Sequence, residues 1–220
     1  DYERRYLFTA VARYDGISKL SDNRWGFFPG VSAGWNVHEE AFFKDSELAK
    51  VVSTVKPRIS YGINGNVNGI GNYDVYGIYD KQTAYNGTTG ILNTGVINSK
   101  LKWETTYTFN ARMDLGFFDN RIYLTAEYYK KDTKDLLINA TLPAHIGYGS
   151  AYRNIGRVEN KGFELSLNTV NMKRRHFNWT TDFNISFNRN KVLALANNQS
   201  VLPADNLKIP NGAALYIAKV

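Results

Sequence analysis

The chain has 220 residues, a formal net charge of +7 and no cysteine, and 21% of its residues are charged. The lack of cysteine excludes disulfides and thiolate metal sites, and no run approaches the ~20 consecutive apolar residues that a membrane helix needs. Aromatic residues make up 14%, with 15 tyrosines, 12 phenylalanines and 4 tryptophans, a content that is high for a soluble domain and usual for a β-barrel with aromatic girdles.

Alternating apolar and polar side chains predict three strands in the first third of the chain. The first covers residues 4–14, where the alternation is weak, and the second covers residues 25–37. The third, at 56–64, sets Ile59 and Tyr61 against Arg58. The segment HEEAFFKDSELAKVVSTV, between the second and third strands, is the only helix-like one, and we expect one or two turns there.

A segment of nearly forty residues, from 65 to about 102, has no strong periodicity and is rich in Gly, Asn and Tyr. Connections usually have ~4–6 residues, and much longer ones are usually functional or disordered. Aromatic faces stack on sugar rings, while amides and carboxylates bond hydroxyls. The ligand-binding candidates are therefore Tyr73, Tyr76, Tyr79, Asp80 and Tyr85. The competing interpretation, to which we give more weight, is that these tyrosines pack the loop or dock it on a partner.

Four clear strands follow, at residues 103–118, 121–135, 160–170 and 177–189, with a polar connection from Lys191 onward. Their apolar rows carry no charge through the middle of the strands, and the eight residues expected on that face are Phe109, Met113, Leu115, Leu124, Phe163, Leu165, Phe183 and Ile185. Their polar rows suit a wet barrel lumen or a solvent face equally. In a barrel, the lumen-facing residues are Asn110, Arg112, Asp114, Glu127 and Asp182.

The turn at Asp119–Asn120 fixes the register of its two strands. A two-residue hairpin loop there places Leu115 beside Leu124, and Arg112 beside Glu127 as a cross-strand ion pair. A loop one residue longer would put the two apolar rows on opposite faces of the sheet, so the register is strongly constrained.

Loop lengths alternate between long and short along the chain, with the helical link as the one exception. Long loops at one end of the strands and short turns at the other are typical of an outer-membrane barrel. The strands are also longer than the ~5–6 residues of an ordinary strand. These features favour a transmembrane barrel, and a soluble β-sandwich that binds a ligand stays open at this point.

No pattern of chemistry-bearing residues predicts an enzyme. His38, His145 and His176 are far apart and lack metal-ligand spacing. There is no G-x-S-x-G elbow, and the run GINGNVNGIG lacks the Lys-Ser/Thr of a phosphate loop. We therefore expect no catalytic residue, metal or cofactor.

The basic clusters at 128–134 and 173–176 do not suggest nucleic-acid binding. We interpret both as solvated turns, with contact to lipid phosphates as the alternative.

Several blocks of sequence resemble the barrel region of the SusC/RagA family of TonB-dependent outer-membrane transporters. The most specific are LKWETT, YYKKDTKDLL and VENKGFE. The stretches NRWGFFPGVSAGWNVHEEAFF, PRISYGINGN and FNWTTDFNISFNRNKVLAL also match, in the family's order, so the resemblance covers most of the chain.

The resemblance implies an all-β fold of antiparallel up-and-down strands. Residues 1–220 would supply about seven strands, roughly a third of a large transmembrane barrel that has about 22 strands in such transporters. The loops near 65–102 and 136–158 would be extracellular. No plug domain, TonB box or signal peptide is present in the sequence, and its last residues are still apolar, so we expect a piece of a longer chain.

The resemblance also implies a function and partners. The protein would sit in the outer membrane of a Bacteroidetes-type bacterium and import a nutrient such as an oligosaccharide or peptide. A SusD-like surface lipoprotein would act as a lid, the TonB complex would supply energy, and the barrel would contact membrane lipid. The alternatives are a soluble β-sandwich ligand-binding module and an adhesin-type barrel.

Overall fold

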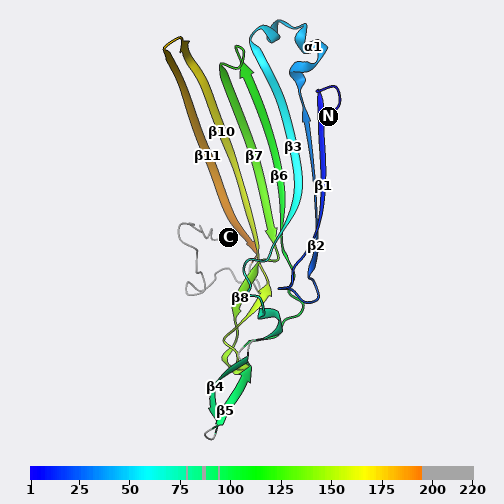
Figure 1. Cartoon of the computed structure of the whole chain (residues 1–220), viewed down its shortest axis with the longest axis vertical. Helices are drawn as coiled ribbons and strands as arrows, with labels where there is room; N and C mark the ends of the chain where they lie inside the picture. Colours follow the sequence, from blue (N-terminus) through cyan, green and yellow to red (C-terminus); the bar gives the residue numbers. More distant parts are fainter. Residues whose placement is uncertain (78, 86–87, 94, 195–220) are drawn as a thin grey trace.

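A computed structural model describes residues 1–77, 79–85, 88–93 and 95–194, and its main feature is a seven-stranded antiparallel sheet (Figure 1). The strands, in spatial order, are β1 (Tyr6–Gly16), β2 (Trp25–Trp35), β3 (Val52–Asn66), β6 (Glu104–Phe117), β7 (Ile122–Lys134), β10 (Arg157–Arg174) and β11 (Phe177–Ala194). Each strand pairs with the next long strand along the chain, so the topology is up-and-down. The predicted all-β fold of about seven antiparallel up-and-down strands is confirmed.

Shorter elements occupy the connections. The β2–β3 link holds η1 (Val37–Glu39), α1 (Ala41–Lys44) and η2 (Glu47–Lys50), which confirms the short helical segment, except that its last residues belong to β3, which begins at Val52. The loops at the opposite end hold η3 (Asp74–Tyr76), β4 (Tyr79–Tyr85), β5 (Thr88–Asn93), β8 (Leu137–Thr141), η4 (Ala144–Ile146) and β9 (Ser150–Asn154). None of the helices in the described ranges has the length and apolarity needed to cross a membrane.

The two ends of the sheet differ as the loop lengths predict. Figure 1 shows α1 and the β6–β7 and β10–β11 turns at the upper end, with β4, β5 and β8 at the lower end. We call these the short-turn end and the loop end. At the β6–β7 turn, Asp119 and Asn120 have φ of 54° and 60°, and the Arg121 amide donates to the Phe118 carbonyl at 3.1 Å. Positive φ at both central residues is the condition for a type I′ turn, whose twist matches that of the strands.

The predicted register of this hairpin is confirmed. Leu115 pairs with Leu124, and Arg112 pairs with Glu127. The predicted limits of the later strands are too short: β10 begins at Arg157, and β11 continues to Ala194, so the start of the segment expected as a polar connection from Lys191 is strand. Near these ends the alternation reverses, because charged residues such as Glu159 and Lys191 lie on the apolar face and Val158 and Val192 lie on the polar face, so the pattern no longer marks the strand there.

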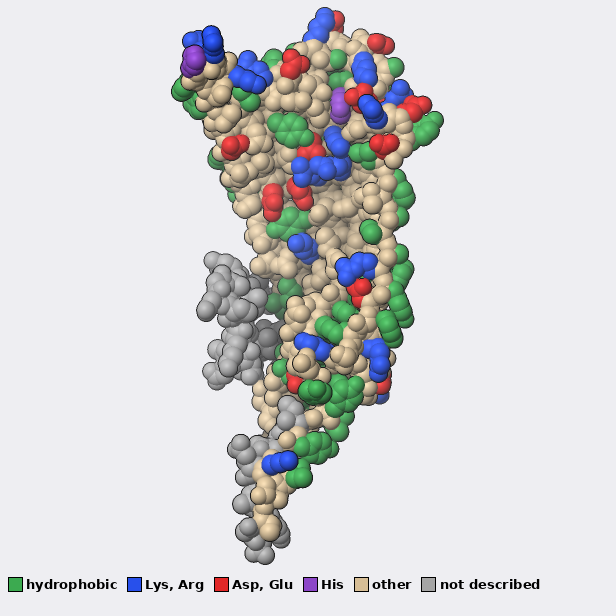
Figure 2. Space-filling view, viewed as in Figure 1, with side chains coloured by type: hydrophobic (Ala, Val, Ile, Leu, Met, Phe, Trp, Pro, Cys, Tyr) green, Lys and Arg blue, Asp and Glu red, His purple; other side chains and the backbone are tan. Residues whose placement is uncertain are grey.

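The sheet is one-sided. The eight residues predicted to share the apolar face do so in the strand register, and large members stay exposed, including Phe163 at 41% and Phe183 at 50%. A β-sandwich would cover this apolar face with a second sheet, so its exposure argues against that alternative. In Figure 2, charged side chains gather over the upper half of the molecule and hydrophobic ones line its right-hand margin.

The loop end is a packed unit. Its core consists of six buried side chains from three loops: Leu20, Val67, Ile70, Val75, Leu101 and Leu137. Hydrogen bonds join the same loops, since the Asp22 amide donates to the Ser99 carbonyl at 3.3 Å and Asn98 Nδ2 donates to the Tyr152 carbonyl at 3.0 Å. The segment at 65–102, expected as a loop without periodicity, therefore contributes both core residues and the β4–β5 hairpin.

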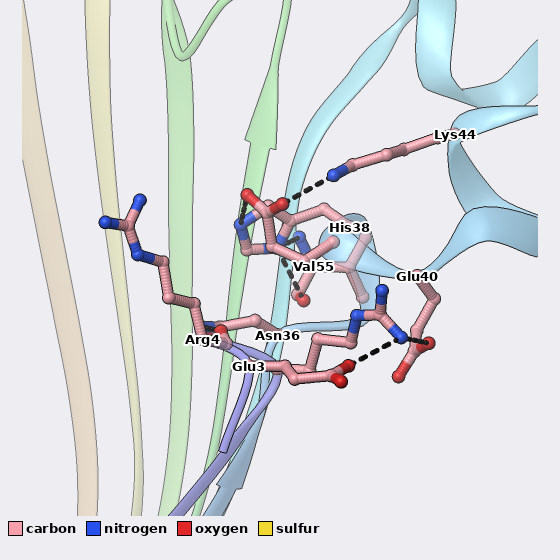
Figure 3. Close-up of polar contacts among 9 residues, drawn as sticks. Glu3, Arg4, Asn36, His38, Glu40, Lys44 and Val55 are labelled. Atoms are coloured by element: carbon pink, nitrogen blue, oxygen red, sulfur yellow. Dashed lines mark hydrogen bonds and ion pairs between the residues drawn. The ribbon is translucent and has the colours of Figure 1, made fainter. Parts of the chain in front are cut away.

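Ion pairs at the short-turn end join the N-terminal segment to the β2–β3 link and also form within that link (Figure 3). Arg5 contacts Glu40 at 3.6 Å, and Lys44 donates to Glu39 at 2.6 Å. The Lys44 hydrogen bond lowers the pKa of Glu39. The hydrogen bond from the Trp35 indole, at 2.9 Å, is the largest cause of the lowered pKa of Glu40, so both carboxylates stay ionised at neutral pH.

Candidate functional site

The polar face of the sheet gathers its charge around one buried carboxylate, Asp114, whose side chain is 1% exposed. Arg58 Nη2 on β3 donates to Asp114 Oδ2 at 2.5 Å, and Arg112 Nε donates to Oδ1 at 2.9 Å. Thr125 Oγ1 on β7 donates to Oδ1 at 2.9 Å. Asp114 therefore joins three neighbouring strands through charge-assisted hydrogen bonds, the stronger class of such bonds.

The register explains why a carboxylate is needed there. Arg58 and Arg112 lie directly opposite each other on β3 and β6, and like charges in that position repel. Asp114 bonds both guanidinium groups and neutralises part of their charge. The predicted ion pair between Arg112 and Glu127 also forms, at 3.9 Å, but it is looser than the Arg112–Asp114 contact.

Two hollows flank this cluster on the polar face. One, of ≈ 380 Å³, is lined by Lys56, Arg58, Asn110, Arg112 and Glu127 among others. The second, of ≈ 570 Å³, lies between β7, β10 and β11 and is lined largely by hydroxyl, amide and carboxylate side chains. Such linings offer donors and acceptors to a polar solute. In residues 1–77, 79–85, 88–93 and 95–194, no group of three or more His, Asp or Glu is placed to hold a metal ion.

The five residues predicted to face a lumen all lie on the polar face. Asn110, Arg112, Asp114 and Glu127 are neighbours on β6 and β7. Asp182 lies apart on β11, where Asn168 of β10 donates a hydrogen bond to it. Sequence alternation thus identifies the face, and the strand register separates the central cluster from its outlying member.

The predicted ligand tyrosines lie at the loop end. Tyr73 is 73% exposed, Tyr76 is 49% exposed, and Tyr79, which begins β4, is 62% exposed. Val75 lies between Tyr73 and Tyr76 in the sequence and is fully buried in the loop core, so it holds the turn that carries these two tyrosines. The backbone of Asp80 and Tyr85 belongs to β4, whereas their side chains lie outside the described part of the structure.

Two members of the charged cluster are not among the predicted site residues. Arg58 and Thr125 bond Asp114, yet only the polar rows of their strands mark them. The predicted hairpin register already places Thr125 opposite Asp114, and this pairing is confirmed. Arg58 could not be placed in this way, because the pairing of β3 with β6 spans a long connection whose geometry the sequence does not specify.

Comparison with known proteins gives a consistent result. The family model described as "TonB dependent receptor-like, beta-barrel" matches residues 1–212. TonB-dependent receptor P39 of Formosa agariphila is 39% identical over 197 residues, which cover 89% of this chain and 19% of that protein. TonB-dependent receptor SusC of Bacteroides thetaiotaomicron is 36% identical over 200 residues, which cover 87% of this chain and 20% of that protein.

A solved structure agrees with these relatives. The structure of the RagAB peptide transporter superposes with a TM-score of 0.83 at 26% identity, over 92% of this chain and 22% of the matched chain. The chain therefore spans about a fifth of the length of the proteins that it matches.

Proposed function

Because the chain belongs to the TonB-dependent receptor-like β-barrel family, we propose that it forms part of the barrel wall of an outer-membrane nutrient importer. The one-sided sheet is the observation that carries this proposal: its apolar side chains are exposed, which lipid would cover. Strand length supports it, since the seven main strands have 11 to 18 residues and crossing the bilayer takes ~9–11. The family is one of receptors and transporters, not enzymes.

In this proposal, residues 1–220 are one domain segment, about seven strands of a barrel with about 22. The plug domain and the segment that contacts TonB belong to the rest of a longer protein. A SusD-like lipoprotein caps the loop end, and an oligosaccharide or peptide passes along the polar face. The match to the structure of the RagAB peptide transporter supports a peptide as the substrate. The similarity to TonB-dependent receptor SusC supports membership of the same class of outer-membrane protein.

Orientation is the first test. Cysteine at Gly149, where the structure leaves open space around the added side chain, reports on the loop end; cysteine at exposed Arg175 reports on the short-turn end. Asn86, in the other long loop, lies outside the described residues, so Gly149 is the labelling site chosen for this end. A membrane-impermeant maleimide should label Gly149→Cys but not Arg175→Cys on whole cells, since the loops face outward. In permeabilised cells both variants should be labelled. Labelling of Arg175→Cys alone on whole cells would show that the orientation is the opposite of the one proposed.

The same assay distinguishes the roles proposed for the loop tyrosines. Tyr73→Cys should label less in cells that contain the surface lipoprotein than in cells that lack it, because a docked lid covers the loop. Cells denatured before labelling provide the control and should react equally. Protection by nutrient alone would instead assign Tyr73 to ligand contact, and equal labelling under every condition would contradict both roles.

A further inference from the structure

On the apolar face, the uncharged rows end abruptly toward the loop end in a row of three cations. Lys130 on β7, Lys161 on β10 and Arg189 on β11 lie directly opposite one another in the register. We call these three residues the cation row. The row next to it, farther from the loops, is Tyr128, Phe163 and Phe187. Like charges placed directly opposite destabilise a sheet, so this arrangement needs a compensating anion.

The protein supplies only part of that compensation. Glu159 contacts Lys130 at 3.0 Å and Lys161 at 3.6 Å, and Asp132 accepts two hydrogen bonds from Arg157. The register places Lys134 and Lys191 on the same face, so six basic residues there meet two carboxylates.

Burial increases the imbalance at the surface. The side chains of Asp132 and Glu159 are only 16% and 14% exposed, whereas those of Lys130, Lys161 and Arg157 are 44–48% exposed. The carboxylates therefore lie beneath, and the cations reach outward. A partner that approaches this surface meets a layer of positive charge at the border of an apolar belt.

We propose that the cation row binds the phosphate groups of lipid A, the phosphorylated glycolipid of the outer leaflet. The proposal rests on the barrel and orientation proposed above, which put this border at the headgroup level of that leaflet. The two parts of lipid A match this surface. Its acyl chains would cover Phe163 and Phe187, and its phosphates would lie beside the cation row. Ammonium and guanidinium groups both bind phosphate through charge-assisted hydrogen bonds.

The chain offers a matched control. Lys173, Arg174 and Arg175 form an equally basic, exposed cluster in and beside the β10–β11 turn. That cluster lies at the short-turn end, so it faces the other leaflet in the proposed orientation. Replacing three cations there changes the net charge of the protein by the same amount and leaves the cation row intact.

The test is binding of the intact purified outer-membrane protein to mixed micelles of detergent and lipid A, with dephosphorylated lipid A and phosphatidylglycerol as separate arms. Each basic residue near an anionic surface strengthens binding roughly fivefold. The triple variant Lys130→Gln/Lys161→Gln/Arg189→Gln should therefore weaken lipid A binding on the order of a hundredfold. Lys173→Gln/Arg174→Gln/Arg175→Gln should leave it unchanged, and dephosphorylated lipid A should bind the wild-type protein weakly.

Three results would overturn the proposal: equal affinity of the two triple variants, binding of dephosphorylated lipid A as tight as that of lipid A, or equal binding of phosphatidylglycerol. A heat-modifiable band on unboiled gels verifies that each variant is folded. The labelling of Gly149→Cys separates this proposal from the one on which it rests. Normal labelling with unaltered lipid binding contradicts the lipid A site alone, and inverted labelling contradicts the orientation.

Discussion

Replacing Leu165 with arginine should sharply reduce the yield of folded barrel, whereas Ser166→Arg, at the next residue of β10, should be tolerated. Leu165 pairs with Ala126 and Ile185 within the apolar rows. An arginine facing lipid near the bilayer midplane costs about 2–4 kcal/mol. The two variants share the strand, the depth and the charge that is introduced, so they differ only in the face.

The structure gives a reason for the tolerance of Ser166→Arg. Ser166 lines the hollow of ≈ 570 Å³, together with Glu127 and Glu164. These two carboxylates lie opposite each other in the register, so a nearby guanidinium would reduce their repulsion. The measurement is the fraction of heat-modifiable folded protein in outer-membrane preparations, and equal yields of the two variants would contradict the assignment of the faces.

Asp114→Asn should lower the unfolding temperature of the barrel more than any other neutralisation of a single carboxylate on the polar face. The substitution leaves Arg58 and Arg112 opposite each other without their shared anion. Removing one partner of a buried ion pair costs about 3–5 kcal/mol, and the lower end applies because the arginines are 38–39% exposed.

Asp182→Asn is the matched control for this variant. Asp182 is an exposed carboxylate on the same face, and an asparagine can still accept the hydrogen bond from Asn168. Its unfolding temperature, read from the loss of the heat-modifiable band, should stay near that of the wild type. If Asp114→Asn melts no lower than Asp182→Asn, the cluster does not hold the strands together.

The sequence was sufficient to predict what depends on neighbouring residues. Alternation identifies the two faces, and the turn at Asp119–Asn120 determines the β6–β7 register, so the pairing of Leu115 with Leu124 could be derived. Because the side-chain period is two, a register shifted by one residue would place apolar residues on the polar face. The same constraint places Arg112 beside Glu127.

Features that join distant segments could not be predicted in this way. Arg58 reaches Asp114 only because β3 pairs with β6 across the 67–103 connection. The loop core combines residues such as Leu20 and Leu101 that follow no local period. The cation row also depends on the registers of three strands, one of which shifts between Val170 and Met172.

The central claim is that the sheet lies in the membrane with its apolar face toward lipid, and a spin-label scan of β7 tests it most directly. Labels are placed singly at residues 122 to 128 of the intact protein in lipid bilayers, and their collisions with oxygen and with a water-soluble nickel complex are measured. Oxygen collisions should peak at Ile122, Leu124, Ala126 and Tyr128, and nickel collisions at Tyr123, Thr125 and Glu127. The opposite phase, or nickel access at every position, would contradict the account.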